Sequence, residues 1–175
     1  MRNKILIASI SILFLFLFAV FFKGLNNSNI YTPIFQKNIN LPEFVAKDFF
    51  SDEAIKSKDL FLNNQFYLIN IWASWCLPCK VEHEFLLKFK DESEIKLIGI
   101  NYKDKKKNAT KFLRELKNPF DKIIVDNDGT ISINLGAYGV PETFLIKNNK
   151  IIKKIIGPIN NKNYLEILKK INEKN

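Results

Sequence analysis

The sequence predicts an α/β domain in which helices cover both faces of a central mixed sheet, preceded by one membrane-spanning helix. Three observations support this prediction: an uncharged apolar run near the N-terminus, buried-strand patterns that alternate with helical patterns from residue 66 onward, and a final hairpin followed by an amphipathic helix. Strands mixed with helices in this way are typical of a sheet packed between helices. About 135 residues follow residue 40, which is enough for one domain with its own core but not for two.

The apolar run from Ile5 to Phe22 predicts a membrane anchor. A helix of that length rises about 27 Å, close to the roughly 30 Å of a bilayer's hydrocarbon core. A cleavable signal peptide is the alternative. Its apolar region is usually shorter and ends in small residues, whereas this run ends in Val20-Phe21-Phe22-Lys23. We therefore expect an uncleaved anchor at residues 5–22.

Basic residues predict the orientation of this anchor. Two of them precede the run and Lys23 alone follows it, so the positive-inside tendency leaves residues 1–4 in the cytoplasm. A polar linker at 23–40 would then lead to an exported domain at 41–175. The net charge of +9 could indicate a nucleic-acid partner, but an exported domain meets no genome, so we interpret the scattered lysines as solvated surface.

Hydrophobic periodicity places the elements of the exported domain. Residues 66–72 and 95–102 are nearly continuous apolar runs, which are typical of buried parallel strands. A helical pattern at 80–92 lies between them, so these segments predict a right-handed strand–helix–strand unit. The later elements are a helix at 108–116 capped by Asn108, a strand at 122–126, a hairpin at 143–157 that turns at Asn148-Asn149, and a helix at 161–171.

The two cysteines, Cys76 and Cys79, lie in the segment WASWCLPCK between the first strand and its helix. A disulfide between them closes so short a loop that it stabilises the fold by only about 2 kcal/mol. A structural zinc site needs four ligands, and His83 is the only histidine. Haem attachment needs Cys-x-x-Cys-His, and Lys80 occupies the position of that histidine. The spacing therefore predicts a redox-active pair.

The start of the helix suits this chemistry. Cys76 would lie where unpaired backbone N–H groups and the helix dipole stabilise a thiolate. Pro78 fits the first helical turn, where its missing N–H costs no hydrogen bond. Cys79 would follow one turn further in, shielded and within reach of Cys76. Further along this helix, His83 is expected at the surface.

Four segments carry a family resemblance. They are LINIWASWCLPCKVEHEFL around the cysteines, GINYKD at 99–104, DNDGTISINLGAYGVPETFLI at 126–146, and LPEFVAKDF at 41–49. Together they resemble the CcmG or DsbE family, the membrane-anchored thiol:disulfide oxidoreductases of bacterial cytochrome c maturation. The resemblance covers residues 41–157 and implies a thioredoxin-like fold.

The resemblance also implies further residues of the site. Pro141 matches the family's cis-proline, which implies a cis Val140–Pro141 bond and a loop whose backbone docks an extended substrate peptide. Glu82 and Glu142 match the family's two active-site acids. Because an anionic neighbour disfavours a thiolate, acids at this site favour a dithiol that donates electrons. Trp75 would shape the exposed rim.

The resemblance implies a reductant that needs no metal and no organic cofactor. Cys76 would attack a disulfide in an exported substrate, and Cys79 would resolve the mixed disulfide. The substrate would be the Cys-x-x-Cys-His pair of an apocytochrome c or a maturation partner bound to it, and electrons would come from a membrane thiol reductant. The protein would cross the bacterial inner membrane once, with its domain in the periplasm and no nucleic-acid partner.

Three alternatives stay open on the sequence. A general extracytoplasmic reductant with many clients would use the same residues. A thiol peroxidase would need Thr or Ser three residues before its nucleophile, where this chain has Ala73. A non-catalytic chaperone would only hold apocytochrome in the groove beside Pro141.

Overall fold

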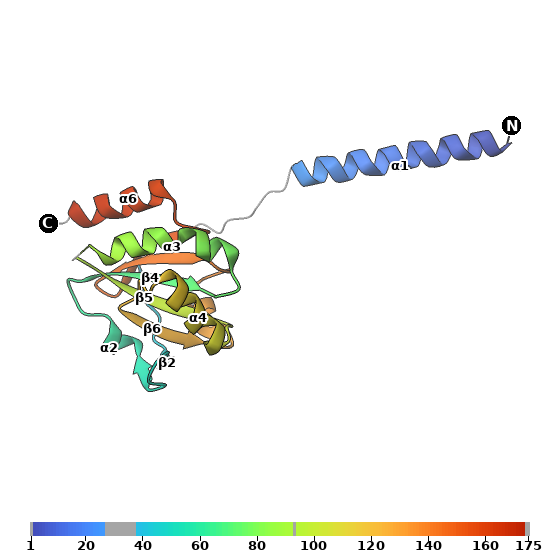
Figure 1. The fold of residues 1–175 in the computed structure, drawn as a ribbon. Helices are drawn as coiled ribbons and strands as arrows, with labels where there is room; N and C mark the ends of the chain where they lie inside the picture. Colours follow the sequence, from blue (N-terminus) through green and yellow to red (C-terminus); the bar gives the residue numbers. More distant parts are fainter. Residues whose placement is uncertain (1, 27–37, 93, 174–175) are drawn as a thin grey trace. The chain divides into compact units, whose positions relative to one another are not determined.

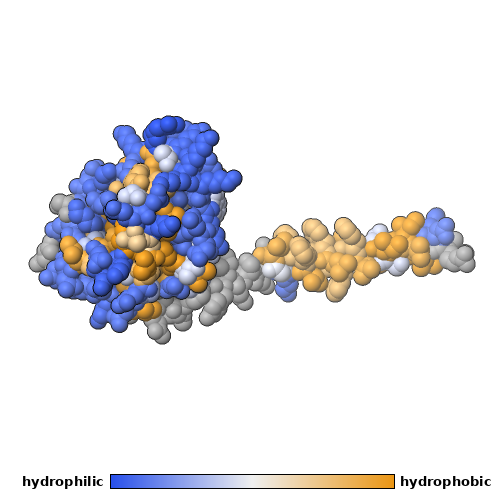
Figure 2. All heavy atoms as spheres, turned by 90° about the horizontal axis from the view of Figure 1, so that it is seen from below, coloured by the Kyte–Doolittle hydropathy of each residue, from blue (hydrophilic) through white to orange (hydrophobic). Residues whose placement is uncertain are grey.

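The computed structural model describes residues 2–26, 38–92 and 94–173, which form two separate units (Figure 1). The first unit is helix α1 (Arg2–Asn26), whose span from Asn3 to Leu25 is long and apolar enough to cross a membrane. Its large apolar side chains are 55% to 71% exposed, and Figure 2 shows apolar surface along the helix. The helix therefore fits the anchor expected at 5–22.

The expected linker differs from the structure at both ends. Helix α1 continues to Asn26, beyond the expected end of the anchor. Strand β1 (Ile39–Asn40) already belongs to the second unit, where it pairs with strand β8 (Lys150–Ile156). The intervening residues 27–37 lie outside the described residues. The folded domain thus begins a few residues earlier than expected.

One mixed sheet organises the second unit, and in the described residues its strand order is β1-β8-β7-β4-β5-β6-β2-β3. Strand β4 (Phe66–Trp72) lies at its centre, in parallel with β5 (Ile95–Tyr102) and antiparallel to β7 (Glu142–Lys147). The remaining strands are β6 (Lys122–Asp126), parallel to β5, and the antiparallel pair β2 (Val45–Asp48) and β3 (Ala54–Lys56) at one edge.

Helices cover both faces of this sheet, as predicted. All seven residues of β4 are buried, and they alternate between two apolar clusters. Phe66, Leu68 and Trp72 face the cluster under helices α3 (Leu77–Lys90), α4 (Lys106–Leu116) and α6 (Asn161–Asn172). Tyr67 and Ile69 face the opposite cluster, which is covered by the short helices α2 (Ser57–Leu60) and α5 (Thr130–Asn134).

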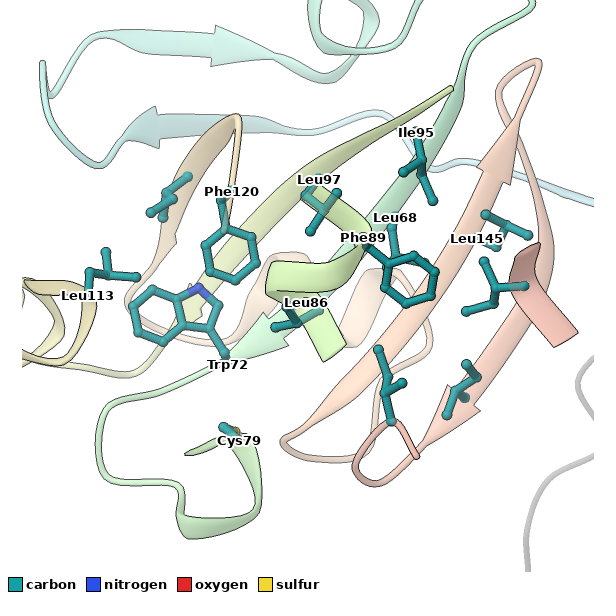
Figure 3. Close-up of a cluster of buried hydrophobic side chains, with 14 of the residues drawn as sticks. Leu68, Trp72, Cys79, Leu86, Phe89, Ile95, Leu97, Leu113, Phe120 and Leu145 are labelled. Atoms are coloured by element: carbon teal, nitrogen blue, oxygen red, sulfur yellow. The ribbon is translucent and has the colours of Figure 1, made fainter. Parts of the chain in front are cut away.

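Trp72 joins the core to the end of the sheet where the cysteines lie. Its indole stacks on Phe112 and Phe120, with ring centroids 5.3 Å and 5.6 Å away. Figure 3 shows the Trp72 ring beside Phe120, with Leu86 and Cys79 nearby. The cysteines therefore belong to the same buried cluster as Trp72, the largest fully buried side chain among the described residues.

The strands predicted at 66–72, 95–102 and 122–126 are confirmed, and so is the final hairpin, whose turn residues Asn148 and Asn149 have φ of 50° and 58°. The cap predicted for the second helix is wrong. Helix α4 begins at Lys106, after the N-cap residue Lys105, so Asn108 lies inside its first turn. The β2–β3 hairpin and α5 were not predicted, because elements of three to five residues carry too little periodicity.

Candidate active site

Cys76 lies between the end of β4 and α3, Cys79 lies in the first turn of α3, and the two form a disulfide with an S–S distance of 2.05 Å. Cys76 is the N-cap residue of α3, and its sulfur accepts a hydrogen bond from the N–H of Cys79 at 3.1 Å. Pro78 lies in the first turn, where an N–H has no partner within the helix. Both cysteines are buried, with 4% and 2% of their surface exposed. Helix N–H groups thus stabilise negative charge on the sulfur of Cys76.

Asp104 holds the loop that leads into Cys76. One of its carboxylate oxygens accepts hydrogen bonds from the Ser74 N–H at 2.6 Å and from the Asn101 side chain at 3.2 Å. The other accepts from the Ser74 hydroxyl and from the Lys105 N–H, both at 2.8 Å. A single carboxylate therefore ties the segment before Cys76 to the end of β5.

Apolar side chains are exposed beside the buried disulfide. Trp75, Leu77 and Val81 are 59%, 73% and 64% exposed. The Trp75 ring is held in place because its Nε1 donates to the carbonyl oxygen of Lys103 at 3.1 Å. The rim of the site thus offers ordered apolar surface, which suits a polypeptide better than a small polar ligand.

Glu82 lies on the buried side of α3, three residues after Cys79, and its side chain is fully buried. One carboxylate oxygen accepts from Nδ2 of Asn70 at 2.8 Å and the other from the N–H of Ile159 at 2.7 Å. Asn70 also donates to the hydroxyl of Thr143 at 2.9 Å. No Lys or Arg in the described ranges forms an ion pair with Glu82.

Burial raises the pKa of Glu82 from 4.5 to about 7, and the hydrogen bonds from Ile159 and Asn70 offset only part of this effect. A carboxyl group with a pKa near neutrality can both accept and release a proton at physiological pH. Because residues three apart share one side of a helix, Glu82 and Cys79 lie on the same buried side of α3. Glu82 is thus suited to exchange a proton with the inner thiol.

Asn70 can serve both protonation states of Glu82. Its Nδ2 donates to the carboxylate, whereas its Oδ1 has no hydrogen-bond partner within the part of the chain that the structure describes. A half-turn of the amide exchanges these two atoms, so that Oδ1 accepts from a protonated carboxyl group. A neighbour with one donor and one acceptor suits a group that gains and loses a proton.

Glu142 lies on the opposite face of the sheet from Glu82. Asn70 and Thr143 are register partners and form their hydrogen bond on the α3 face, so the adjacent Glu142 points to the other face. There its carboxylate lies 2.8 Å from Nζ of Lys154, and the two side chains are only 2% and 3% exposed. Lys154 therefore counters the charge of Glu142, whereas Glu82, on the side of α3 that carries Cys79, pairs with no basic side chain of the described residues.

The peptide bond between Val140 and Pro141 is cis. Because Ile71 pairs with Glu142, Pro141 lies beside the end of β4 that leads to Cys76. Val140 packs against the cluster that contains both cysteines. Among the described residues, none hydrogen-bonds to the backbone N–H or C=O of Val140. This backbone is therefore free to pair with an extended peptide.

Comparisons with known proteins agree with this geometry. Residues 36–168 match the Redoxin family model. The thiol:disulfide interchange protein DsbE of Vibrio cholerae is 36% identical over 135 residues, which cover 77% of this chain and 72% of that protein. DsbE of Haemophilus influenzae is 33% identical over 153 residues, or 87% of this chain and 80% of that protein. The chain belongs to the DsbE family.

The thioredoxin-like fold and the thiol:disulfide oxidoreductase activity expected from the sequence are thereby confirmed. The thioredoxin domain of a thiol-disulfide oxidoreductase from Bacteroides vulgatus matches with a TM-score of 0.64 at 19% identity, over 78% of this chain and 99% of that chain. This DsbE-family protein has a thioredoxin-like fold and is a thiol:disulfide oxidoreductase, with Cys76 and Cys79 as its cysteine pair.

The expectation that His83 is exposed is wrong. It is 4% exposed, its Nε2 donates to the carbonyl oxygen of Lys117 at 2.8 Å, and its ring packs edge-on against Phe112. Burial lowers its pKa more than the hydrogen bonds from its ring to carbonyl oxygens raise it, so a neutral ring joins α3 to the end of α4. A helical pattern could have revealed this, because the buried side of α3 is spaced as Cys79, Glu82, His83 and Leu86.

Three other residues of this DsbE-family site were not predicted. Asn70 left a signal, because a polar residue inside a buried strand requires a hydrogen-bond partner. The sequence also contains a signal for Lys154. It follows Lys153 directly in a strand, and consecutive strand residues point to opposite faces, so the two lysines lie on different faces of the sheet. Asp104 belongs to the GINYKD segment, but no local pattern connects it with Ser74.

Proposed function

We propose that this protein is a reductant of exported polypeptides, and that its principal substrate is the cysteine pair of an apocytochrome c or of a maturation partner bound to it. The buried carboxyl group of Glu82 is the observation that supports electron flow from the enzyme to the substrate. When ionised, it disfavours a thiolate nearby, and a less stabilised dithiol gives up its electrons more readily. The cytochrome substrate is proposed from the family resemblance of the motifs around Cys76 and Pro141.

The proposed reaction is a dithiol–disulfide exchange that needs no metal and no organic cofactor. The thiolate of Cys76 attacks one sulfur of the substrate disulfide, which breaks that bond and releases one substrate thiolate. Cys79 passes its proton to Glu82 and attacks the sulfur of Cys76, which releases the second substrate thiolate. Two electrons reach the substrate, and the enzyme is left with the disulfide between Cys76 and Cys79.

The surroundings of the disulfide support a polypeptide substrate. An extended segment would pair with the free backbone of Val140 and place its disulfide over Cys76. The exposed rings and alkyl chains of Trp75 and Leu77 would cover apolar side chains of that segment. Such contacts require no fixed substrate sequence beyond the cysteines, so a broader set of clients would use the same surface.

We further propose that α1 anchors the protein in the bacterial inner membrane, with the domain on the periplasmic side. The exposed apolar side chains of α1 support the anchor, and the basic residues before Ile5 support the orientation. Electrons would then be supplied by a membrane thiol reductant, since the oxidised enzyme must be reduced again after each turnover.

A trapping experiment tests the proposed function. In Cys79→Ser, the mixed disulfide cannot be resolved, so substrates should accumulate on Cys76 and can be identified after non-reducing purification from cells. The matched control is Cys76→Ser with Cys79→Ser, which should trap nothing. Recovery of apocytochromes or maturation proteins supports the proposal. Recovery of many unrelated exported proteins favours a general reductant instead.

Maturation in cells tests the two remaining alternatives. If Cys76→Ser supported full cytochrome maturation without added reductant, the protein would act as a chaperone and not as a reductant. Rapid turnover of hydrogen peroxide by the wild-type protein would favour a peroxidase. The buried Ala73 argues against the latter, because it supplies no hydroxyl group near Cys76.

A further inference from the structure

We propose that Glu142 and Lys154 form a clamp that shapes the loop at 136–141, and that this clamp controls substrate binding and not the reduction potential of the cysteines. The inference rests on the proposed function insofar as that loop docks the substrate. It assigns a positioning role to Lys154, and it gives Glu142 a role other than setting the reduction potential of the cysteine pair.

Glu142 holds the loop from its C-terminal end. One carboxylate oxygen accepts two backbone hydrogen bonds, from the N–H of Tyr138 at 2.6 Å and from the N–H of Gly139 at 3.0 Å. The other oxygen lies 2.8 Å from Nζ of Lys154. Both N–H groups belong to exposed residues directly before Val140. The carboxylate thus fixes the path of the backbone on which the substrate would dock.

Lys154 holds the same loop from the neighbouring strand. Its Nζ donates to the carbonyl oxygen of Gly136 at 2.6 Å, at the start of the loop. The same ammonium group lies 3.7 Å from the ring centroid of Tyr138, whose side chain is 60% exposed. A cation over an aromatic ring restrains its position. Lys154 therefore fixes both the first residue of the loop and a ring on its outer surface.

The burial of this pair argues for a positioning role. Two charges removed from water lose hydration energy that their attraction often fails to recover, so a buried ion pair is weak evidence for stabilisation. This pair instead satisfies three backbone groups of a single loop, which fixes one geometry of that loop. Its place on the face away from Cys79 and Glu82 separates it from the sulfur chemistry.

The test compares a peptide substrate with a small one in single turnovers of the reduced full-length chain in detergent, where KM is the substrate concentration that gives half the maximal rate. Lys154→Met and the double variant Glu142→Gln/Lys154→Met remove the clamp, whereas Lys154→Arg keeps the charge. The control is Lys153→Met, because Lys153 is paired with Glu166 on the opposite face. The substrates are a disulfide peptide containing Cys-x-x-Cys-His and 5,5′-dithiobis(2-nitrobenzoate), which has no backbone to dock on the loop.

Loss of the clamp should raise KM for the peptide about tenfold, because a loosened loop must be ordered again on binding. Turnover at saturating peptide, the rate with the small disulfide and the reduction potential should stay unchanged. Lys154→Arg should recover most of the peptide KM, and Lys153→Met should match the wild type. A changed potential with an unchanged peptide KM overturns the proposal, as does an unchanged KM in both clamp variants.

A measurement on the wild-type chain covers the case in which the variants do not fold. Hydrogen exchange at the amides of Tyr138 and Gly139 should be slow, although both residues are exposed. Exchange at the rate of an unstructured loop would show that the clamp does not hold, and would refute the inference. Failure of the proposed function gives a different result, because the wild-type protein itself would then not reduce the peptide.

Discussion

Glu82 links the redox site to the pH dependence of stability. Below about pH 4.5 its carboxyl group is protonated in both the folded and the unfolded chain, so its ionisation does not change the free energy of unfolding. As the pH rises toward about 7, the unfolded chain loses this proton before the folded chain does, so the free energy of unfolding falls and then levels off. The difference between the two pKa values corresponds to roughly 3 kcal/mol.

We therefore predict that Glu82→Gln becomes progressively more stable than the wild type between pH 4.5 and 8, by up to about 3 kcal/mol at the upper end. The fold should tolerate glutamine, because its oxygen can accept from Ile159 while the amide of Asn70 turns to accept from its nitrogen. Urea unfolding of the oxidised chain at several pH values measures this. A stability difference that does not change with pH would contradict the assignment.

The reduction potential of the Cys76–Cys79 couple should also change in Glu82→Gln, and the cysteine pair of this variant should be more oxidising than that of the wild type.

At the level of elements, Asp104 joins the loop before Cys76 to strand β5. In Asp104→Asn one acceptor oxygen becomes an NH₂ group, which in either orientation faces a backbone N–H group, that of Ser74 or that of Lys105, so at least one of the four bonds is lost. We predict a loss of about 1–3 kcal/mol in the free energy of unfolding. We also predict faster alkylation of Cys76 in the reduced chain, because its loop is released.

The control for this prediction is Asp52→Asn. Asp52 also pairs with a lysine, Lys106 at 3.0 Å, but its side chain is 66% exposed. Exposed ion pairs contribute less than about 1 kcal/mol, so this variant should keep both the stability and the alkylation rate of the wild type. Equal effects in the two aspartate variants would show that Asp104 does not hold the loop.

The length of an element decides how well its sequence predicts it. Strands β4 and β5 are long apolar runs, and their buried, parallel arrangement follows from that pattern. Helix α3 shows its buried side through spacing alone, although the polar side chain of His83 led to the wrong prediction of exposure. The four residues of β2 and the three of β3 repeat no pattern long enough to separate a strand from a loop.

At the level of the whole molecule, sheet register determines which site residues meet. The sequence predicts both acids but not that they lie on opposite faces, because this depends on the pairing of Asn70 with Thr143 across 73 positions of chain. The same register brings Pro141 beside the loop that carries Cys76. Local periodicity can predict a strand and its faces, but it carries no information on which residue of another strand lies opposite.

The last prediction concerns the orientation of the whole chain, on which the proposed chemistry depends. A reductant of exported cysteines must place Cys76 outside the cytoplasm, and Arg2 and Lys4, which precede the uncharged run that starts at Ile5, indicate that it does. In a chain with Cys76→Ser and Cys79→Ser, the exposed Lys58 can be changed to cysteine as a reporter. We predict that a membrane-impermeant maleimide labels this cysteine fully in intact spheroplasts. A reporter cysteine at Asn3, before the uncharged run that starts at Ile5, should react only after permeabilisation. The reverse pattern would place the domain among cytoplasmic thiols and leave it without exported disulfides to reduce.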